Sequence, residues 1–106
     1  MPCTIKRKSD FSYVRNHGLR IKSSSVITVF AKSPQESVAY IASKRIVGKA
    51  VRRNKAKRRL RSLVQEFRDK IKSGLFLFIA TSKTASVDFS KLKSDFLCNL
   101  NKINND

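Results

Sequence analysis

The chain has 106 residues, a length that predicts a single domain with one modest hydrophobic core. Lysine and arginine number 24 against 7 aspartate and glutamate, which gives a formal net charge of +17 at pH 7. A hydrophobic content of 41% favours a folded domain over a disordered basic tail. The net charge predicts a polyanionic partner, for which nucleic acid is the leading candidate and an anionic membrane surface is the alternative.

The two cysteines, Cys3 and Cys98, lie at opposite ends of the sequence, without the spacing of a metal site or a disulfide framework. This usage indicates a reducing, cytoplasmic setting. The polar N-terminal residues do not resemble a secretory signal, and no apolar run approaches the roughly 20 residues that span a bilayer. We therefore expect a cytoplasmic protein with no membrane partner, no metal site of its own and no organic cofactor.

The first predicted element is a short helix from about Asp10 to His17. Ser9 followed by Asp10 is typical of a helix start, and Gly18 is placed as a C-terminal stop. A helix this short is unstable alone and needs a sheet on which to dock. Ile21, a few residues later, is compatible with an additional early strand, although the serines that follow it do not favour one.

Two strands are predicted next, over residues 25–31 and 37–42, because both stretches are rich in β-branched and apolar side chains. Residues 33–36, with the sequence SPQE, predict a turn between them. An antiparallel hairpin is the simplest connection for two strands this close in sequence.

A long basic helix is predicted from about Val47 to a stop at Ser73 and Gly74. At 100° per residue its apolar side chains form one stripe about 80° wide, which predicts the side that faces the core; the stripe consists of Ala56, Leu60, Leu63, Val64, Phe67 and Ile71. Arg53 projects toward the same side, whereas Val47 and Val51 do not. The first turns of the helix are therefore expected to extend beyond the core.

Residues 75–80, LFLFIA, are apolar at every position, as in a strand buried on both faces. A final helix follows, capped by Ser86 or Asp88, and its apolar residues recur at three- and four-residue spacing: Phe89, Leu92, Phe96, Leu100 and Ile103. Residues 101–106 are expected to form a ragged polar tail. The order αββαβα, with the early strand left open, predicts one α+β sandwich domain with helices packed on a small sheet.

The stretch from Ser43 to Arg61 carries the strongest chemical signal. Ten of its nineteen residues are lysine or arginine, and no acidic residue occurs between Glu36 and Glu66. Cations in the first turn of a helix oppose the helix dipole, and neighbouring like charges repel, so fold stability does not explain this run. The planar fork of arginine suits phosphate. We therefore expect this helix to bind nucleic acid.

The run VGKAVRRNKAKRRLR resembles the signature of the bacterial ribonuclease P protein subunit, in which an Arg-Asn-Arg triplet is followed by Lys-Arg and by another Arg one turn later. Arg53 and Asn54 match the first two triplet positions, Lys57 and Arg58 match the pair, and Arg61 matches the later Arg. The resemblance covers most of the chain. It includes the DF and HG pairs of the first helix, the strand VAYIASKR, and LFLFIA followed by TSKTASVDFSKLKSDF.

This resemblance implies a two-layer αβββαβα sandwich with a small mixed sheet and a left-handed β-α-β crossover, like the second domain of a small-subunit ribosomal protein. It implies a monomer in a one-to-one complex with ribonuclease P RNA, where magnesium bound mainly by the RNA cleaves precursor tRNA. The protein would hold no catalytic residue. Its RNA-binding residues would be Lys44, Lys49, Arg52, Arg53, Asn54, Lys55, Lys57, Arg58 and Arg61. The leader of precursor tRNA would lie in a cleft lined by Phe11, Arg15, Ile27 and Val29.

Four positions depart from the family pattern. Lys55 replaces the last Arg of the triplet, which keeps the charge and loses the bidentate fork. Arg52 and Ala56 stand where the family has apolar residues, and Arg15 stands where it has a second aromatic residue in the first helix.

The alternative function is that of a basic structural RNA-binding protein of the ribosomal type, which would share the charge without needing this spacing or a cleft. The single histidine, His17, is expected to end a helix and not to act as a general base.

Overall fold

The computed structural model of the protein describes residues 3–4, 8–33, 36–71 and 74–104, with side chains from residue 12 onward. The predicted order αβββαβα is confirmed, and Ile21 lies in a strand. Two short elements, β1 and α2, were not predicted. The described strands are β1 (Cys3–Thr4), β2 (Leu19–Lys22), β3 (Val26–Ala31), β4 (Ser37–Ile41) and β5 (Leu75–Ala80). The described helices are α1 (Lys8–His17), α2 (Lys44–Val47), α3 (Ala50–Glu66), the 3₁₀ turn η1 (Arg68–Lys70) and α4 (Phe89–Asn104).

The strand β5 lies at the centre of the sheet, in which the strands follow the order β1-β4-β5-β3-β2. It pairs antiparallel with β3 and parallel with β4. The predicted hairpin between residues 25–31 and 37–42 is therefore wrong, because β5 separates the two strands. Side chains that are apolar on both faces of β5 require the central position, where strands flank both edges and helices cover the sheet. Residues 34–35 of the predicted turn lie outside the described residues.

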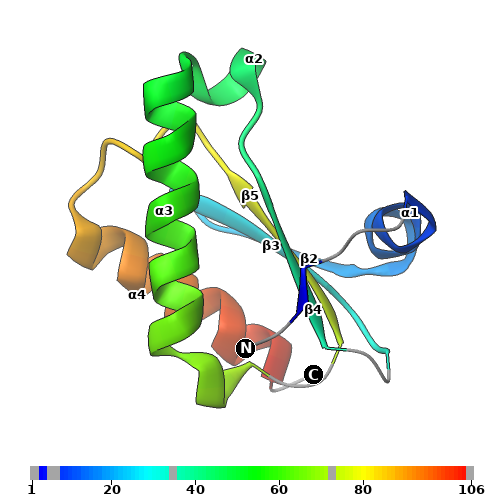
Figure 1. Ribbon diagram of the computed structural model, residues 1–106. Coiled ribbons are helices and arrows are strands. Elements are labelled where there is room, and N and C mark those ends of the chain that lie inside the picture. The colour runs from blue at the N-terminus through cyan, green and yellow to red at the C-terminus, as the bar shows by residue number, and fades with distance from the viewer. Residues whose placement is uncertain (1–2, 5–7, 34–35, 72–73, 105–106) are drawn as a thin grey trace.

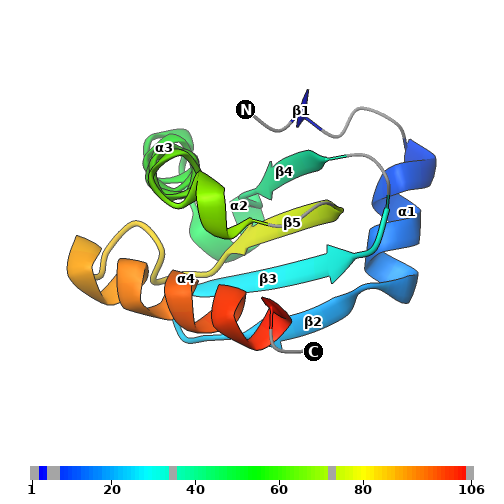
Figure 2. The ribbon, with the colours of Figure 1, turned by 90° about the horizontal axis from the view of Figure 1, so that it is seen from below.

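The connection from β4 through α2 and α3 to β5 is a left-handed crossover between parallel neighbours (Figures 1 and 2). General topology rules favour the right-handed form, and the family resemblance had implied this exception. The helices α3 and α4 lie on one face of the sheet, and α1 lies on the opposite face (Figure 1). The α+β fold with a small mixed sheet is confirmed.

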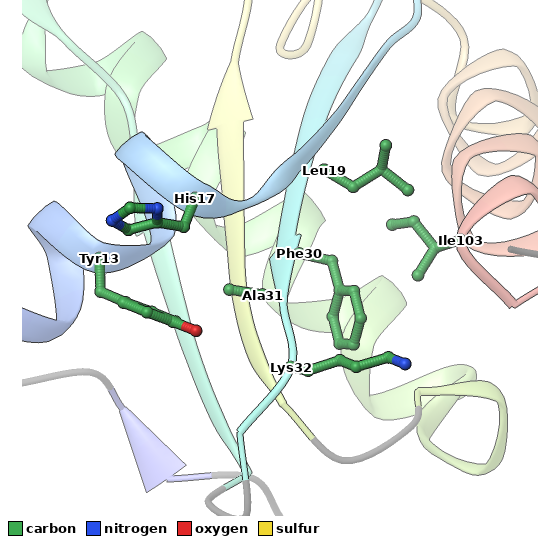
Figure 3. Close-up of a pocket in the computed structure, with 7 residues that line it drawn as sticks. All are labelled: Tyr13, His17, Leu19, Phe30, Ala31, Lys32 and Ile103. Carbon is green, nitrogen blue, oxygen red and sulfur yellow. The ribbon is translucent and has the colours of Figure 1, made fainter.

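Alternation along the strands divides the core into two clusters, one on each face of the sheet. Figure 3 shows this division at the end of β3, where Phe30 points toward Ile103 of α4 and the neighbouring Ala31 toward the side of α1. The larger cluster lies under α3 and α4 and contains the rings of Phe30, Phe76, Phe78 and Phe96. The smaller cluster lies under α1 and contains Val14, Ile27, Val29, Ala31, Ala39, Leu75 and Leu77.

Three predicted boundaries need correction. The helix α1 begins at Lys8, two residues before the predicted start. The helix α3 ends at Glu66 and not at Ser73, because Phe67 leaves helical geometry at φ −108° and ψ 28°. At the C-terminus, residues 101–104 continue α4 instead of forming a ragged tail, since the side chain of Ile103 is fully buried in the larger cluster. Residues 105–106 lie outside the described residues.

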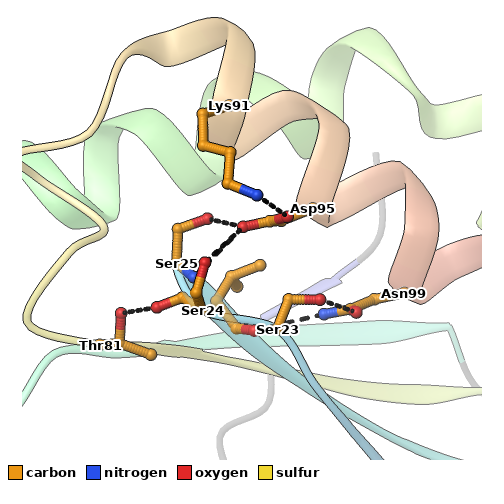
Figure 4. Close-up of polar contacts among 8 residues, drawn as sticks. Ser23, Ser24, Ser25, Thr81, Lys91, Asp95 and Asn99 are labelled. Atoms are coloured by element: carbon orange, nitrogen blue, oxygen red, sulfur yellow. Dashed lines mark hydrogen bonds and ion pairs between the residues drawn. The ribbon is translucent and has the colours of Figure 1, made fainter.

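A polar network ties the turn before β3 to α4 (Figure 4). Ser25 donates from Oγ to Asp95 Oδ2 at 2.6 Å, and Lys91 Nζ lies 3.2 Å from Asp95 Oδ1. One helical turn later, Asn99 Oδ1 accepts a hydrogen bond from Ser23 Oγ at 2.6 Å. Burial by itself would raise the pKa of Asp95, but the hydrogen bonds from Ser25 and Lys91 and the charge of Lys91 lower this pKa below its ordinary value. The serines before β3 therefore fix α4 on the sheet.

We expect Asp95→Asn to lower the free energy of unfolding by about 2 kcal/mol at neutral pH, because a buried, charge-assisted network loses its anion. The pKa of Asp95 is lower in the folded chain than in the unfolded chain. Its stabilisation is therefore present above the unfolded pKa of about 3.9 and is lost as the pH falls through the folded value. Urea denaturation across this pH range should show a smaller acid-induced loss in Asp95→Asn than in the wild type. The same acid-induced loss in both proteins would assign it to other carboxylates.

Candidate nucleic-acid interface

The helix α3 displays its cations because its opposite side is fixed to the sheet. Ala56, Leu60, Leu63 and Val64 are buried in the larger cluster, as their spacing predicted. Each of the four is at most 1% exposed. The basic residues of α3 therefore occupy the remaining sides of the helix, where they meet either solvent or the elements next to α3.

A break at Gly48 separates α2 from α3, where the sequence predicted one continuous helix from Val47. Gly48 has φ 105° and ψ −140°, a conformation that other residues adopt only with strain. The helix α2 is capped by Ser43, whose Oγ accepts a hydrogen bond from Ile46 N at 3.1 Å. The break directs Val47 into the core at 4% exposure, so the prediction that Val47 points away from the core is wrong. Val51, which is 79% exposed, points away as predicted.

The N-terminus of α3 concentrates positive charge. Lys49 is the N-cap residue, its side chain makes no capping hydrogen bond, and no acidic residue occurs in the first turn. The N–H groups of the first turn and the helix dipole add charge of the same sign as Lys49, Arg52 and Arg53. This arrangement opposes helix stability and favours a bound anion such as phosphate.

Arg59 stabilises the fold, a role that was not predicted from the sequence. Its Nη1 donates to the carbonyl oxygens of Thr84 and Val87 at 3.1 and 2.7 Å, and its guanidinium lies 5.8 Å from the centre of the Phe89 ring. These contacts hold the loop between β5 and α4 against α3. Arg58 and Arg59 are adjacent and chemically identical, and they differ in their position around α3 relative to the core. This position decides that Arg59 contacts the loop, whereas Arg58 is exposed to solvent.

Arg52, a predicted RNA-binding residue, also contacts backbone carbonyls. It donates from Nε to Val47 O and from Nη2 to Ser82 O, each at 3.1 Å. The first bond joins α3 to the end of α2, and the second joins α3 to the loop that Arg59 holds. Arg52 therefore positions the N-terminal end of the basic helix in the free protein, although its side chain remains exposed.

Arg53, Lys57 and Arg61 recur at four-residue spacing and share one side of α3. Arg61 lies over the ring of Tyr40 in β4, 5.6 Å from its centre. Burial raises the pKa of Tyr40, and the positive charge of Arg61 opposes this rise. Arg53 is half-buried, as its inclination toward the apolar stripe predicted, and its Nε is buried without a hydrogen-bond partner among the described residues. Such an unsatisfied donor is unfavourable in the free protein.

The other predicted RNA-binding side chains are exposed to solvent: Lys44 of α2, Lys49 before α3, and Asn54, Lys55 and Arg58 of α3. Their charge has no acidic neighbour in sequence, because residues 37–65 contain no aspartate or glutamate. The ion pairs Lys91–Asp95 and Lys93–Glu66 both involve α4 and leave these cations unneutralised. The exposed face of α2 and α3 is therefore a continuous source of positive potential.

A cleft of about 440 Å³ lies on the opposite face of the sheet, beside α1. Its apolar lining comes from β3, β4 and β5, and its cations come from α1 and β2. The full lining consists of Arg15, Asn16, Arg20, Val29, Ile41, Ser43, Leu77 and Ile79. An apolar floor with arginines along one side can hold a strand whose bases pack on the floor while its phosphates meet the arginines.

Two of the four predicted cleft residues, Arg15 and Val29, line this cavity. Ile27 belongs to the same face and is buried at 8% exposure in the smaller cluster. Phe11 lies within α1, and its side chain is outside the described part of the chain. Arg20 and the residues from β4 and β5 were not predicted to line the cleft, because only the strand order brings them beside α1.

Close packing of Gly18 fixes α1 at the edge of the cleft. A Cβ atom at this position would lie 2.6 Å from Val29 Cγ1 and would also clash with the carbonyl of Val14. Gly18 therefore ends α1, as predicted, because only glycine lets the chain pass this close to β3. At the other end of the cleft, Ser43 both lines the cavity and caps α2. At the end of β4 the cleft thus reaches the N-cap of α2, whereas α3 lies on the opposite face of the sheet.

Other sequence features contribute no second chemistry to this interface. His17 ends α1 and is exposed, with its ring centre 5.2 Å from that of Tyr13. Within the part of the chain that the structure describes, no three His, Cys, Asp or Glu side chains gather as a metal site would require. None of the described helices is long and apolar enough to cross a membrane.

Residues 2–104 match the family model described as Ribonuclease P. A Ribonuclease P protein component from Nitratiruptor sp. is 32% identical over 100 residues, which cover 94% of this chain and 91% of that protein. One from Coprothermobacter proteolyticus is 34% identical over 84 residues, covering 79% and 70%. The fold is similar to that of the RNase P protein from Staphylococcus aureus, with a TM-score of 0.80, 21% identity and coverage of 97% and 95%. For the RNase P protein from Thermotoga maritima the TM-score is 0.78, with 26% identity and coverage of 93% and 96%.

The adjacent residues Arg58 and Arg59 test the division between free and structural arginines. Arg59→Ala removes hydrogen bonds to two loop carbonyls and should lower the free energy of unfolding by about 2 kcal/mol. Arg58→Ala removes the same charge from an exposed position and should change it by no more than about 0.5 kcal/mol. Urea denaturation of the free protein measures both. Equal changes would show that net charge, and not the loop contacts, determines the effect.

Proposed function

Because the chain belongs to the ribonuclease P protein family, we propose that it is the non-catalytic protein subunit of a ribonuclease P holoenzyme. It binds the catalytic RNA through α2 and α3 and the 5′ leader of precursor tRNA through the cleft beside α1. In this way it promotes removal of the leader at the tRNA 5′ end. The observation that supports this function most directly is the unneutralised basic face of α3 together with a separate, apolar-floored cleft whose rim is also basic.

The basic face supplies affinity for a structured RNA. Each phosphate that a lysine or arginine neutralises releases condensed counterions, so exposed cations such as Lys55 and Arg58 bind RNA without reading its sequence. Asn54 adds a neutral side chain that donates and accepts hydrogen bonds. Arg53 Nε, buried without a partner among the described residues, gains one if a phosphate or ribose oxygen approaches that side of α3.

The cleft supplies selectivity for precursor over mature tRNA. Val29, Leu77 and Ile79 offer an apolar floor, which favours unpaired bases or riboses over a duplex whose bases are stacked inside. Arg15 and Arg20 stand where they can meet the phosphates of the same strand. A basic structural RNA-binding protein would share the charge of α3 and would have no use for this second surface.

Magnesium chemistry is assigned to the RNA subunit in this proposal. The cleft is lined by arginines, aliphatic side chains, one asparagine and one serine, without a carboxylate. This donor set does not fit a site for magnesium, which prefers carboxylate and phosphate oxygens. The protein therefore contributes by binding and orienting RNA, and no step of hydrolysis is assigned to its side chains.

The proposed function is tested by cleavage of a precursor tRNA by a bacterial ribonuclease P RNA at low magnesium concentration. The expected result is faster cleavage at the mature 5′ end when this protein is added, because the protein neutralises phosphates that magnesium otherwise screens. A comparably basic protein without the cleft is the control. Equal stimulation by both proteins would favour the alternative of a general RNA-binding protein, and no stimulation by this protein would contradict the proposal.

Arg58→Ala tests the basic face itself. Since one phosphate contact is lost, the slope of log affinity against log salt for ribonuclease P RNA should become shallower by about 0.9. Arg61→Ala should have a similar effect on the slope, with an additional loss of its contact to Tyr40. Lys102→Ala, an exposed position on α4, is the control and should leave the slope unchanged. Filter binding over a range of salt concentrations measures the slopes, and three unchanged slopes would remove Arg58 and Arg61 from the interface.

A further inference from the structure

A second cavity, which we call the outer cavity, lies on the other flank of α1 and has a volume of about 480 Å³ (Figure 3). Tyr13 and His17 of α1 stand on one side of it, and Leu19 of β2 stands on the other. The lining is completed by Phe30 and Ala31 at the end of β3, by Lys32 directly after this strand, and by Ile103 of α4. The volume falls within the range of about 300–1,000 Å³ that is typical of small-molecule sites.

The outer cavity and the cleft lie back to back at the junction of α1 and β2. Arg15, Asn16 and Arg20 line the cleft, whereas His17 and Leu19, which lie between Asn16 and Arg20 in sequence, line the outer cavity. Gly18 lies between these two sets of residues, and the neighbours Val29 and Phe30 of β3 likewise line different spaces, Val29 the cleft and Phe30 the outer cavity. A flexible strand that leaves the cleft at this junction therefore reaches the outer cavity by passing around the end of α1.

The chemistry of the outer cavity combines exposed rings with one flexible cation. Tyr13 is 46% exposed, and its ring is tilted by 41° from that of His17, so the two rings do not stack on each other. Phe30 and Ile103 are buried and form an apolar floor. Lys32 is exposed at the rim. Aromatic rings above an apolar floor suit a flat, unstacked base, and a lysine beside them suits its phosphate.

We infer that the outer cavity binds one unstacked nucleotide of the 5′ leader, beyond the segment held in the cleft. This inference rests on the proposed function and extends it, because it makes leader binding depend on leader length. A leader too short to pass around α1 occupies the cleft alone. A longer leader gains a second contact, in which its base stacks on Tyr13 or His17 and its phosphate meets Lys32.

The test uses the holoenzyme and a series of precursor tRNAs whose leaders are lengthened one nucleotide at a time. For the wild type, affinity should rise with length and then rise again when the leader reaches the outer cavity. Tyr13→Ala should abolish the second rise and weaken binding of the longest leaders about tenfold, the size of loss that deletion of a base-stacking ring causes. Tyr13→Phe keeps the ring and should retain the second rise. Lys32→Ala should reduce the second rise. Lys22→Ala, which changes an exposed lysine of β2, is the control and should leave the second rise unchanged.

Arg15→Ala separates failure of this inference from failure of the proposed function. It should weaken the binding of precursors with short and long leaders alike, because Arg15 lines the cleft. If Arg15→Ala has this effect and Tyr13→Ala weakens all leaders equally or none of them, the outer cavity is not a leader site, while the proposed function stands. If neither the wild type nor any variant distinguishes precursor from mature tRNA, leader binding itself is wrong. Unfolding curves for each variant exclude losses caused by misfolding.

Discussion

The burial of β5 on both faces is the constraint on which the rest of the structure depends. A strand whose side chains are apolar on both faces is stable only at the centre of a sheet that is covered on both sides. The chain meets this requirement by placing β5 between β3 and β4, which precede it in the sequence, and by covering one face with α3 and α4 and the other with α1. The helix that closes the larger cluster is also the helix that carries the cations, so the core determines which of its residues face the solvent.

This coupling gives the arginines of α3 two separate roles. Those that flank the core stripe on the side of α4, Arg52 and Arg59, donate to carbonyl oxygens of neighbouring segments, where partial negative charge offsets part of their repulsion. Those on the far side, such as Arg58, are exposed to solvent. Like charges on successive turns destabilise a helix, and the burial of Leu60 and Leu63 compensates for this repulsion. The core therefore stabilises the basic face.

The parts of this structure that could be predicted from the sequence are those with local periodicity. The apolar stripe of α3 follows from side-chain spacing, and the strand β5 follows from an unbroken apolar run. The signature around Arg53 pointed to the family that the comparisons show. Pairing between distant segments was not accessible in this way. The hairpin prediction failed because nearness in sequence does not decide which strands are neighbours when a later strand has the stronger need for burial.

Short or isolated signals were missed for related reasons. The helix α2 is a single turn, too short for any periodic pattern, and only the backbone conformation of Gly48 separates it from α3. In the sequence, the serines before β3 only argued against an early strand at Ile21. Their role was not predicted, because the partner of Ser25, Asp95, lies 70 residues later in the chain. In the cleft, the family resemblance indicated Arg15, but Arg20 and Leu77 join it only through the strand order.

The left-handed crossover then decides whether this cleft exists at all. With the same strand order, a right-handed crossover would place α3 on the face of the sheet that α1 occupies, over the smaller cluster and the cleft. The left-handed path leaves that face to α1 alone, and the thickness of the sheet separates the basic helix from the cleft. An RNA bound along α3 therefore does not compete for the space in which a single strand can lie.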